Sequence, residues 1–320
     1  SVGFDYVFDA DFAADLTIME ESSELIARLR EPEKYSWPMF TSCCPGWVSF
    51  AKTQYPDILP QLSTAKSPQQ MFGTVIKTYF AQKKGIKPEN ISCVSLMPCL
   101  SKKRELTLPG MDSAGTGHDI DYVLTTREIC RLIKADNIDV TLQPETNFDD
   151  PLGEASGAGV IFGTSGGVLE AALRTAYYKV TGQNPDLGEN SPLKVLRNIS
   201  SHKEIEIELG NKKLHCAAVS SLGEARKLIT SIKRGECHYD FVEVMACPGG
   251  CINGGGQPIH PSYNSMPNSY TERDHCLREY DNRNNIRFSH ENKAIQTLYD
   301  DYLDFPMSDR AHHLLHVEKY

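Results

Sequence analysis

Two adjacent cysteines, Cys43 and Cys44, follow an apolar run and precede the turn residues Pro45 and Gly46. Adjacent cysteines cannot easily bond to each other, and they are poorly placed to ligate the same metal ion. We therefore expect the two thiols to have different functions. One can bind a metal centre, while the other stays free and, with a reference pKa near ~8.5, could transfer a proton reversibly at neutral pH.

The other cysteines that could complete a metal site follow strand-like runs. Cys99 comes after the apolar run 91–96, and the sequence Cys-Pro-Gly-Gly-Cys, Cys247 to Cys251, comes after the run 241–245. In an open parallel sheet, sites form at the carboxyl ends of strands. A structural zinc ion is the alternative, but zinc ribbons use paired Cys-x-x-Cys knuckles, and this sequence has no such pair. Four thiolates from three strand ends suit a 4Fe-4S cubane, and the expected ligands are Cys44, Cys99, Cys247 and Cys251.

Three stretches around these cysteines closely resemble the three H-cluster signatures of the diiron (FeFe) hydrogenases. They are residues 40–47, 97–105 and 243–258, and similar stretches around Ser63, 157–167 and 289–292 extend the resemblance through nearly the whole chain. The resemblance implies a hydrogenase that interconverts protons plus electrons with hydrogen. Its cofactor would be the H-cluster, a 4Fe-4S cubane bridged by Cys251 to a diiron subsite with CO, cyanide and an amine-containing dithiolate (azadithiolate).

The resemblance also implies a route for protons, with Cys43 as the last donor. Glu21, Glu24 and Arg28 share one face of an expected helix, and from the sequence alone they read as a solvated salt-bridge face. The resemblance instead makes these three residues and Ser63 a relay to solvent, with water between Cys43 and Glu21.

Further residues would surround the diiron subsite. Lys102, which would otherwise read as surface charge beside Lys103 and Arg104, is suited to hydrogen-bond a cyanide. The resemblance implies that the rest of the pocket includes Met97, Met245, Phe162, Gln69 and Pro68.

The elements that would position these residues alternate between strands and helices, which predicts an α/β fold. We expect two lobes, each with a mainly parallel sheet flanked by helices, with the cluster in the cleft between them. The expected units are residues 1–118, 119–260 and a small-subunit-like C-terminal wrap, extended and helical, at 261–320. The expected strands are 4–8, 37–42, 91–96, 121–124, 204–209, 213–219 and 241–245. After the first strand we expect a helix from Ile18 to Leu29, with a capping box at Thr17. Further expected helices are 71–83, 126–135, 168–178, 222–234 and 292–303, and 259–286 is expected to be extended.

Composition excludes several classes of protein. The chain has 320 residues, 40% of them hydrophobic and 23% charged, with no apolar run near the ~20 residues of a membrane span and no leader, so we expect a cytoplasmic enzyme. The net charge of -9 argues against a nucleic-acid partner. Ten cysteines could suggest disulfides, but a chain of this length does not need them. His312, His313 and His316 could suggest a metal site, although histidines near a terminus are more often exposed or packed.

Electrons would have to come from elsewhere, because no accessory cluster motif occurs in these residues. The expected partners are a ferredoxin or other electron carrier, or upstream iron-sulfur domains absent from this chain, together with maturation proteins. In the family a strand with an Ala-Pro pocket segment precedes the position of Ser1, so we expect a piece of a longer protein or one part of a split one. The alternatives are a non-catalytic iron-sulfur relative, a hydrogen-sensing hydrogenase and a zinc-binding interaction module.

Overall fold

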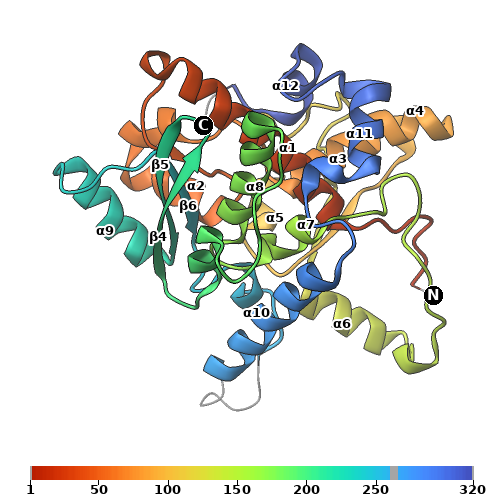
Figure 1. The fold of residues 1–320 in the computed structure, drawn as a ribbon. Coiled ribbons are helices and arrows are strands. Elements are labelled where there is room, and N and C mark those ends of the chain that lie inside the picture. Colours follow the sequence, from red (N-terminus) through yellow and green to blue (C-terminus); the bar gives the residue numbers. More distant parts are fainter. Residues whose placement is uncertain (1, 260–265, 319–320) are drawn as a thin grey trace.

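The strands of this α/β protein form two separate sheets in a computed structural model that describes residues 2–259 and 266–318 (Figure 1). The first sheet has the order β1-β6-β5-β4, in which β1, β6 and β5 are parallel and β4 is antiparallel to β5. The second sheet is a parallel pair, β2 and β3. The bounds are β1 Met39–Phe40, β2 Val94–Met97, β3 Tyr122–Thr125, β4 His202–Leu209, β5 Lys212–Ser220 and β6 Phe241–Met245.

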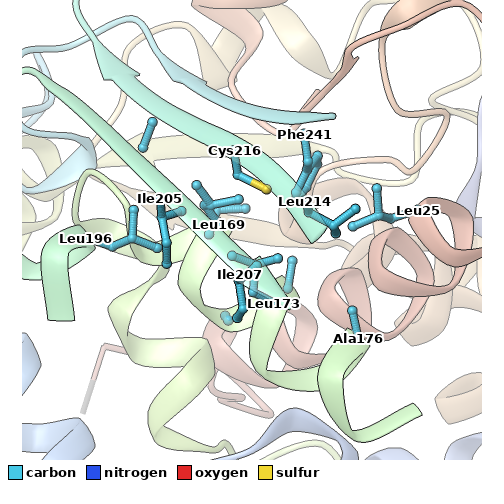
Figure 2. Packing of buried hydrophobic residues seen from close by; sticks show 14 of the residues in the cluster. Leu25, Leu169, Leu173, Ala176, Leu196, Ile205, Ile207, Leu214, Cys216 and Phe241 are labelled. Atoms are coloured by element: carbon cyan, nitrogen blue, oxygen red, sulfur yellow. The ribbon is translucent and has the colours of Figure 1, made fainter. Parts of the chain in front are cut away.

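Helices cover both faces of the four-stranded sheet. On one face, α1 (Ala10–Arg30) and α8 (Gly167–Thr181) pack against the alternating buried residues of β4, including Ile205 and Ile207 (Figure 2). On the other face, α2 (Pro45–Gln54) inserts Trp47 and α9 (Leu222–Lys233) inserts Leu228. Each buried leucine or isoleucine contributes roughly 1.5–3 kcal/mol of transfer free energy, so this sheet is the stable base of the candidate site.

The first helix begins earlier than the sequence predicts. Asp9 caps α1 by accepting a hydrogen bond from the Asp11 amide, and the expected cap, Thr17, lies inside the helix, where its hydroxyl donates to the Ala13 carbonyl. The predicted strand at 4–8 is also wrong, because that segment is a loop. Its Val7 amide donates to Asp149 Oδ2, and the Asp149 amide donates to the Val7 carbonyl. A local capping pattern was therefore overridden by an earlier cap and by burial of nearly the whole helix.

The pairing of the strands also differs from the prediction. The expectation that the strands at 4–8, 37–42 and 91–96 share a sheet is wrong, because β1 pairs with β6 and β2 pairs with β3. Each sheet therefore contains strands from both sides of residue 118. Short apolar runs specify that a strand forms, but their partners are chosen by contacts far apart in the chain.

Most of the other predicted elements are confirmed. The helix predicted at 126–135 is α6 (Thr126–Ala135), and Thr125 and Glu128 form its capping box. The helix predicted at 71–83 runs from α3 (Pro68–Val75) through a π-helical turn (Ile76–Phe80) to α4 (Ala81–Lys84). Shorter helices are α5 (Lys102–Glu105) and α7 (Gly157–Val160), and 3-10 turns occur at Pro32–Lys34, Pro56–Gln61, Pro88–Asn90, Val140–Leu142, Ile161–Gly163, Pro192–Arg197, Cys251–Asn253 and Ser289–Glu291.

The C-terminal segment wraps over α1 and α7, mostly as helix (Figure 1). The prediction of an extended stretch at 259–286 is wrong for α10 (Met266–Arg283), while residues 260–265 lie outside the described part of the chain. The terminal helix is confirmed as α11 (Lys293–Leu298) with a π-helical turn (Tyr299–Leu303), and α12 (Asp309–Leu315) follows. None of the helices in the described residues is long and apolar enough to cross a bilayer.

Candidate functional site

The carboxyl ends of β1 and β6 bring two of the cysteine loops together. Because these strands are neighbours and parallel, the loops that follow them start side by side, and the Cys44 Sγ accepts a hydrogen bond of 3.4 Å from the Ala246 amide. A Cβ added to Gly46 would lie 3.0 Å from the Ala246 Cβ. The two loops can therefore pack this closely because residue 46 is a glycine and has no side chain.

The third cysteine loop is joined to the second by backbone contacts. The Gly256 amide donates to the Pro98 carbonyl at 2.8 Å, and a Cβ on Gly254 would lie 2.3 Å from the same oxygen. Cys99 follows Pro98, and Cys251 precedes this glycine run by three residues. The glycines therefore permit a close approach between the loops that carry Cys99 and Cys251.

The four thiols expected to be ligands interact with one another. Burial raises the pKa of Cys251, and the neighbouring thiols of Cys44, Cys99 and Cys247 raise that pKa further. Burial likewise raises the pKa of Cys44 and of Cys247, and each of these pKa values is also raised by Cys99. Buried thiols with raised pKa values become thiolates when a cation binds them, so this donor set fits a metal cluster.

The spacing of these thiols does not match a site for a single ion. Within residues 2–259 and 266–318, no three His, Cys, Asp or Glu side chains come close enough together to hold one metal ion. Around a zinc ion the sulfurs would be about 3.8 Å apart, given Zn–S bonds of ~2.3 Å. A cubane instead takes its ligands at four separate iron corners, and this wider arrangement fits the four mutually interacting thiols.

Cys43 lies beside a buried ammonium group. Lys102, the first residue of α5, donates from Nζ to the Cys43 carbonyl at 3.1 Å and to both Glu105 carboxylate oxygens at 3.0 Å. Burial raises the pKa of the Cys43 thiol, Glu21 and Cys44 raise it further, and Lys102 opposes them. Burial lowers the pKa of Lys102, but Glu105 outweighs this effect and the net shift is upward, so Lys102 stays charged.

Glu105 is a site residue that the sequence reading missed. Its carboxylate accepts hydrogen bonds from Ser67 Oγ at 2.9 Å and Gln69 Nε2 at 3.1 Å, in addition to Lys102. Gln69, expected in the cofactor pocket, also accepts from Ser95 Oγ at 2.8 Å. In the sequence, Lys102 and Glu105 at i and i+3 look like a surface pair, and only the exposed fraction of Glu105, 4%, identifies it as internal.

A line of polar side chains runs from Glu21 toward the surface. Ser63 Oγ donates to Glu24 Oε2 at 2.8 Å, and its hydrogen bond with Glu21 lowers the pKa of that carboxyl. Glu24 Oε1 accepts from Arg28 Nε at 3.0 Å and from Arg28 Nη2 at 2.6 Å. The Arg28 guanidinium lies over the Tyr35 ring at 5.2 Å, and that ring is exposed at the surface.

Glu21 has the most perturbed carboxyl of this line. Burial raises its pKa to about 8, with a further contribution from the charge of Glu24. Its Oε2 is buried and has no hydrogen-bond partner among the described residues. A buried carboxyl with an unpaired oxygen and a pKa near neutrality can hold and release a proton.

Two of the remaining pocket residues, Met245 and Phe162, lie near Gly250. A Cβ on Gly250, whose φ is 101°, would lie 2.8 Å from Met245 Sδ and from the Gly163 carbonyl, so a side chain is excluded here. Phe162 precedes Gly163 and packs against the core that contains Met245. The other two expected residues are carried by different elements: Met97 ends β2, two residues before Cys99, and packs against a small core with Cys93, Ile120 and Val123, and Pro68 is the first residue of α3.

Glu243 is a second carboxylate that the sequence reading missed. It lies in the centre of β6, fully buried, and accepts from the Gly166 amide at 2.6 Å and the Leu169 amide at 2.8 Å. The carboxylate therefore caps the N-terminus of α8 and fixes the loop before it. A glutamate within the apolar run Phe-Val-Glu-Val-Met was the available signal.

The C-terminal histidines do not form a metal site in the described residues. Both ring nitrogens of His316 are occupied, Nδ1 by Thr64 Oγ1 at 2.8 Å and Nε2 by Glu20 Oε2 at 3.0 Å. His312 stacks on this ring at 5.0 Å between centroids. These contacts attach α12 to the segment that contains Ser63.

Two family models match the chain in succession. Residues 1–255 match the model described as the iron only hydrogenase large subunit, C-terminal domain, and residues 268–318 match that of the iron hydrogenase small subunit. An NADP-reducing hydrogenase subunit of Solidesulfovibrio fructosivorans is 45% identical over 323 residues, covering 100% of this chain and 54% of the relative. The chain thus spans about half the length of this curated relative.

Similarity extends to solved structures and to proteins with a different role. An apo FeFe-hydrogenase variant from Chlamydomonas reinhardtii superposes with a TM-score of 0.84 at 41% identity, covering 99% of this chain and 84% of that chain. A cytosolic Fe-S cluster assembly factor of Xenopus tropicalis is 34% identical over 327 residues, 99% of this chain and 66% of the relative.

Proposed function

Because the chain belongs to the iron-only hydrogenase (FeFe-hydrogenase) family, we propose that it catalyses the reversible reaction of two protons and two electrons to hydrogen. The observation that carries the proposal is the buried polar line Glu21–Ser63–Glu24–Arg28, which leads from the side of Cys43 to the surface. A purely iron-sulfur-binding protein has no need of such a line.

The family carries an iron-sulfur H-cluster, and we propose that the chain binds it through four cysteines. Cys44, Cys99, Cys247 and Cys251 would hold a cubane, and Cys251 would also bridge to a diiron subsite with CO, cyanide and azadithiolate. When bound, this group would pass on electrons received from an external carrier and would provide the iron at which hydrogen forms. The Lys102 ammonium, oriented by Glu105, would donate to an anionic cyanide, and Met97, Met245, Phe162, Gln69 and Pro68 would surround the subsite.

The chain's own residues would deliver protons one at a time. Glu24, held by the Arg28 guanidinium at the outer end of the relay, would exchange protons with solvent, because a guanidinium itself keeps its protons at neutral pH. The Ser63 hydroxyl would pass a proton between Glu24 and Glu21. Glu21, with its pKa raised to about 8, would hold the proton in the interior. Through a water molecule it would then reprotonate the Cys43 thiol.

The test is maturation followed by spectroscopy and turnover. The chain would be loaded with a cubane, matured anaerobically with a synthetic diiron complex, and examined by infrared spectroscopy for CO and cyanide bands. Hydrogen evolution from reduced methyl viologen would be measured on the same sample. We expect both signals; CO and cyanide bands with no turnover at any pH would refute the catalytic proposal.

A non-catalytic iron-sulfur protein is the second candidate, because an assembly factor is 34% identical over nearly the whole chain. It predicts that the four cysteines bind a cubane but that no diiron complex is taken up. Cubane absorption without CO or cyanide bands after maturation would favour this candidate.

A further inference from the structure

The segment that carries Ser63 is held between two distant parts of the chain. On one side, the Ser63 amide donates to the Phe40 carbonyl of β1 at 2.7 Å. On the other side, an antiparallel bridge joins Ala65 to His316, the residue that follows α12. The position of the Ser63 hydroxyl therefore depends on the C-terminal segment as well as on the four-stranded sheet.

The ring of His316 adds two side-chain contacts to this pairing. Its Nε2 lies 3.0 Å from Glu20 Oε2, and its Nδ1 lies 2.8 Å from Thr64 Oγ1. Both Glu20 oxygens act as acceptors, because they also receive hydrogen bonds from the Tyr299 hydroxyl and the Met307 amide. This arrangement selects the neutral tautomer in which Nε2 donates to Glu20 and Nδ1 accepts from the Thr64 hydroxyl.

Thr64 connects the His316 ring to the line of proton-carrying residues. The Thr64 amide donates to Glu24 Oε1 at 3.2 Å and to Glu24 Oε2 at 3.0 Å. Ser63 Oγ donates to the same Oε2 at 2.8 Å and also hydrogen-bonds to Glu21. A shift of Thr64 would therefore move both the amide that holds Glu24 and the hydroxyl that lies between Glu24 and Glu21.

These contacts are shielded from water. Glu20, Ser63, Glu24 and His316 are all buried, whereas the neighbouring His313 of α12 is exposed. A hydrogen bond that is lost in a buried position is not replaced by one to solvent, so the freed group must move or remain unsatisfied. The ring of His316 therefore restricts where Thr64 can lie.

We propose that His316 is a positioning residue for proton delivery, which through Thr64 keeps Ser63 and Glu24 at hydrogen-bonding distance. The inference rests on the proposed function and gives the C-terminal segment a part in it. In each transfer toward the interior, Glu24 gives a proton to the Ser63 oxygen while the Ser63 hydroxyl gives its own proton to Glu21. His316 keeps its proton throughout. Its Nε2 contact attaches the C-terminal segment to α1, whereas its Nδ1 contact aligns the relay.

Two amide variants separate the two contacts of the His316 ring. The side-chain amide of asparagine takes the place of Nδ1, and that of glutamine takes the place of Nε2. His316→Asn therefore retains an acceptor for the Thr64 hydroxyl and loses Glu20, while His316→Gln does the reverse. Thr64→Val removes the same hydroxyl from the other side and leaves the Thr64 amide in place. His313→Gln is the matched control, because His313 is an exposed histidine of the same helix.

In the matured chain, we expect His316→Gln and Thr64→Val to reduce hydrogen evolution by at least ~10-fold with normal iron content, because small misplacements slow a transfer. Their solvent deuterium isotope effect should rise, since proton delivery becomes the slower step. His316→Asn should recover turnover to within ~3-fold of the wild type, because the contact with Thr64 is retained. Combining His316→Gln with Thr64→Val should be no worse than either change alone, because both break one contact. Equal turnover of the Gln and Asn variants would overturn the proposal.

The alignment can also be measured in the unloaded chain. The hydrogen bond from Ser63 lowers the pKa of Glu21, so the loss of this bond should raise that pKa. Guanidinium denaturation compares each variant with the same variant carrying Glu21→Gln, and the difference in stability rises with pH until Glu21 is ionised in the folded chain. In His316→Gln and Thr64→Val this difference should level off at a pH higher by at least ~0.5 than in the wild type. The same levelling pH in all variants would contradict the proposal.

A failure of the proposed function gives a different result. If the matured wild-type chain evolves no hydrogen, the proposed function is wrong, but the denaturation series still decides whether His316 aligns Ser63 with Glu21. If His316→Gln does not fold, Thr64→Val decides alone, because it breaks the same contact and leaves the attachment of the C-terminal segment to Glu20 intact.

Discussion

The protonation of Glu21 can be tested through stability, without any cofactor. Its pKa is raised from 4.5 to about 8, chiefly by burial. At 1.36 kcal/mol per pKa unit, this shift corresponds to about 5 kcal/mol. Because the folded state binds the proton more tightly than the unfolded state, the contribution of Glu21 is most favourable below pH 4.5 and is lost as the pH rises to about 8.

Glu21→Gln should remove this pH dependence, since an amide cannot ionise. The variant should therefore gain stability relative to the wild type as the pH rises, by about 2–3 kcal/mol between pH 6 and pH 9. Guanidinium denaturation of unloaded, reduced chain at several pH values measures this difference. A difference that stays constant between pH 6 and pH 9 would refute the assignment of a raised pKa to Glu21.

Glu170→Gln is the matched control, because Glu170 is an equally buried glutamate with the opposite shift. Burial raises its pKa, but the charges of Arg174 and Arg197 outweigh burial and the net shift is downward. Glu170 is therefore ionised throughout the range from pH 6 to pH 9. Its replacement should destabilise the chain by an amount that does not change over that range.

Three further substitutions test the site and its support. Cys43→Ala should retain iron in the matured protein but reduce hydrogen evolution by ~10²–10⁴-fold, the usual contribution of a positioned proton donor; wild-type turnover with normal iron content would contradict this role. Arg174→Met leaves the fully buried Glu170 short of a cation and should lower the free energy of unfolding by about 3–5 kcal/mol in guanidinium; a loss below about 1 kcal/mol would contradict the assigned burial. Gly250→Ala should cost about 1–3 kcal/mol and reduce bound iron, because φ is 101° and a Cβ would lie 2.8 Å from a methionine sulfur. Gly223→Ala on α9 should change neither iron content nor fold, because its Cβ would meet only Ser221 Oγ at 3.8 Å, an ordinary van der Waals contact.

Local sequence signals predicted an element correctly where the sequence contains the helix cap itself or a continuous apolar run. The helix α6 begins at its predicted residue because Thr125 and Glu128 satisfy each other's amides. The strand β6 matches its apolar run from Phe241 to Met245. The expectation that strand ends gather the cysteine loops agrees with the contact between the loops that follow β1 and β6, while the four-cysteine ligand set stays a prediction.

Other features depend on contacts that no local pattern encodes. The helix α10 is polar and rich in charged residues, and it is stabilised by a distant partner, since Asp281 binds Arg174 of α8 at 2.8 Å. The pairing of β1 with β6 joins segments about 200 residues apart. Glu105 is missed for the same reason, because its burial depends on Ser67 and Gln69 of another segment.

Three glutamates on the buried face of α1 show how contacts separate structural from proton-carrying carboxylates. Glu20 is fully satisfied, with the Tyr299 hydroxyl, the Met307 amide and His316 around its two oxygens. Those partners come from the C-terminal segment, so Glu20 attaches that segment to α1 and has no oxygen left for a mobile proton.

Glu24 and Glu21 differ from Glu20 in the partners that they have. Glu24 binds Arg28, Ser63 and the Thr64 amide, which connects it to the surface side of the line. Glu21 retains an unpaired buried oxygen. An unsatisfied buried acceptor costs roughly 1–3 kcal/mol, and this cost is offset when the carboxyl is protonated or when a water molecule joins it to Cys43. Among the three glutamates, Glu21 is the least stable as a carboxylate, and it is thus the one best suited to hold a proton on its way to Cys43.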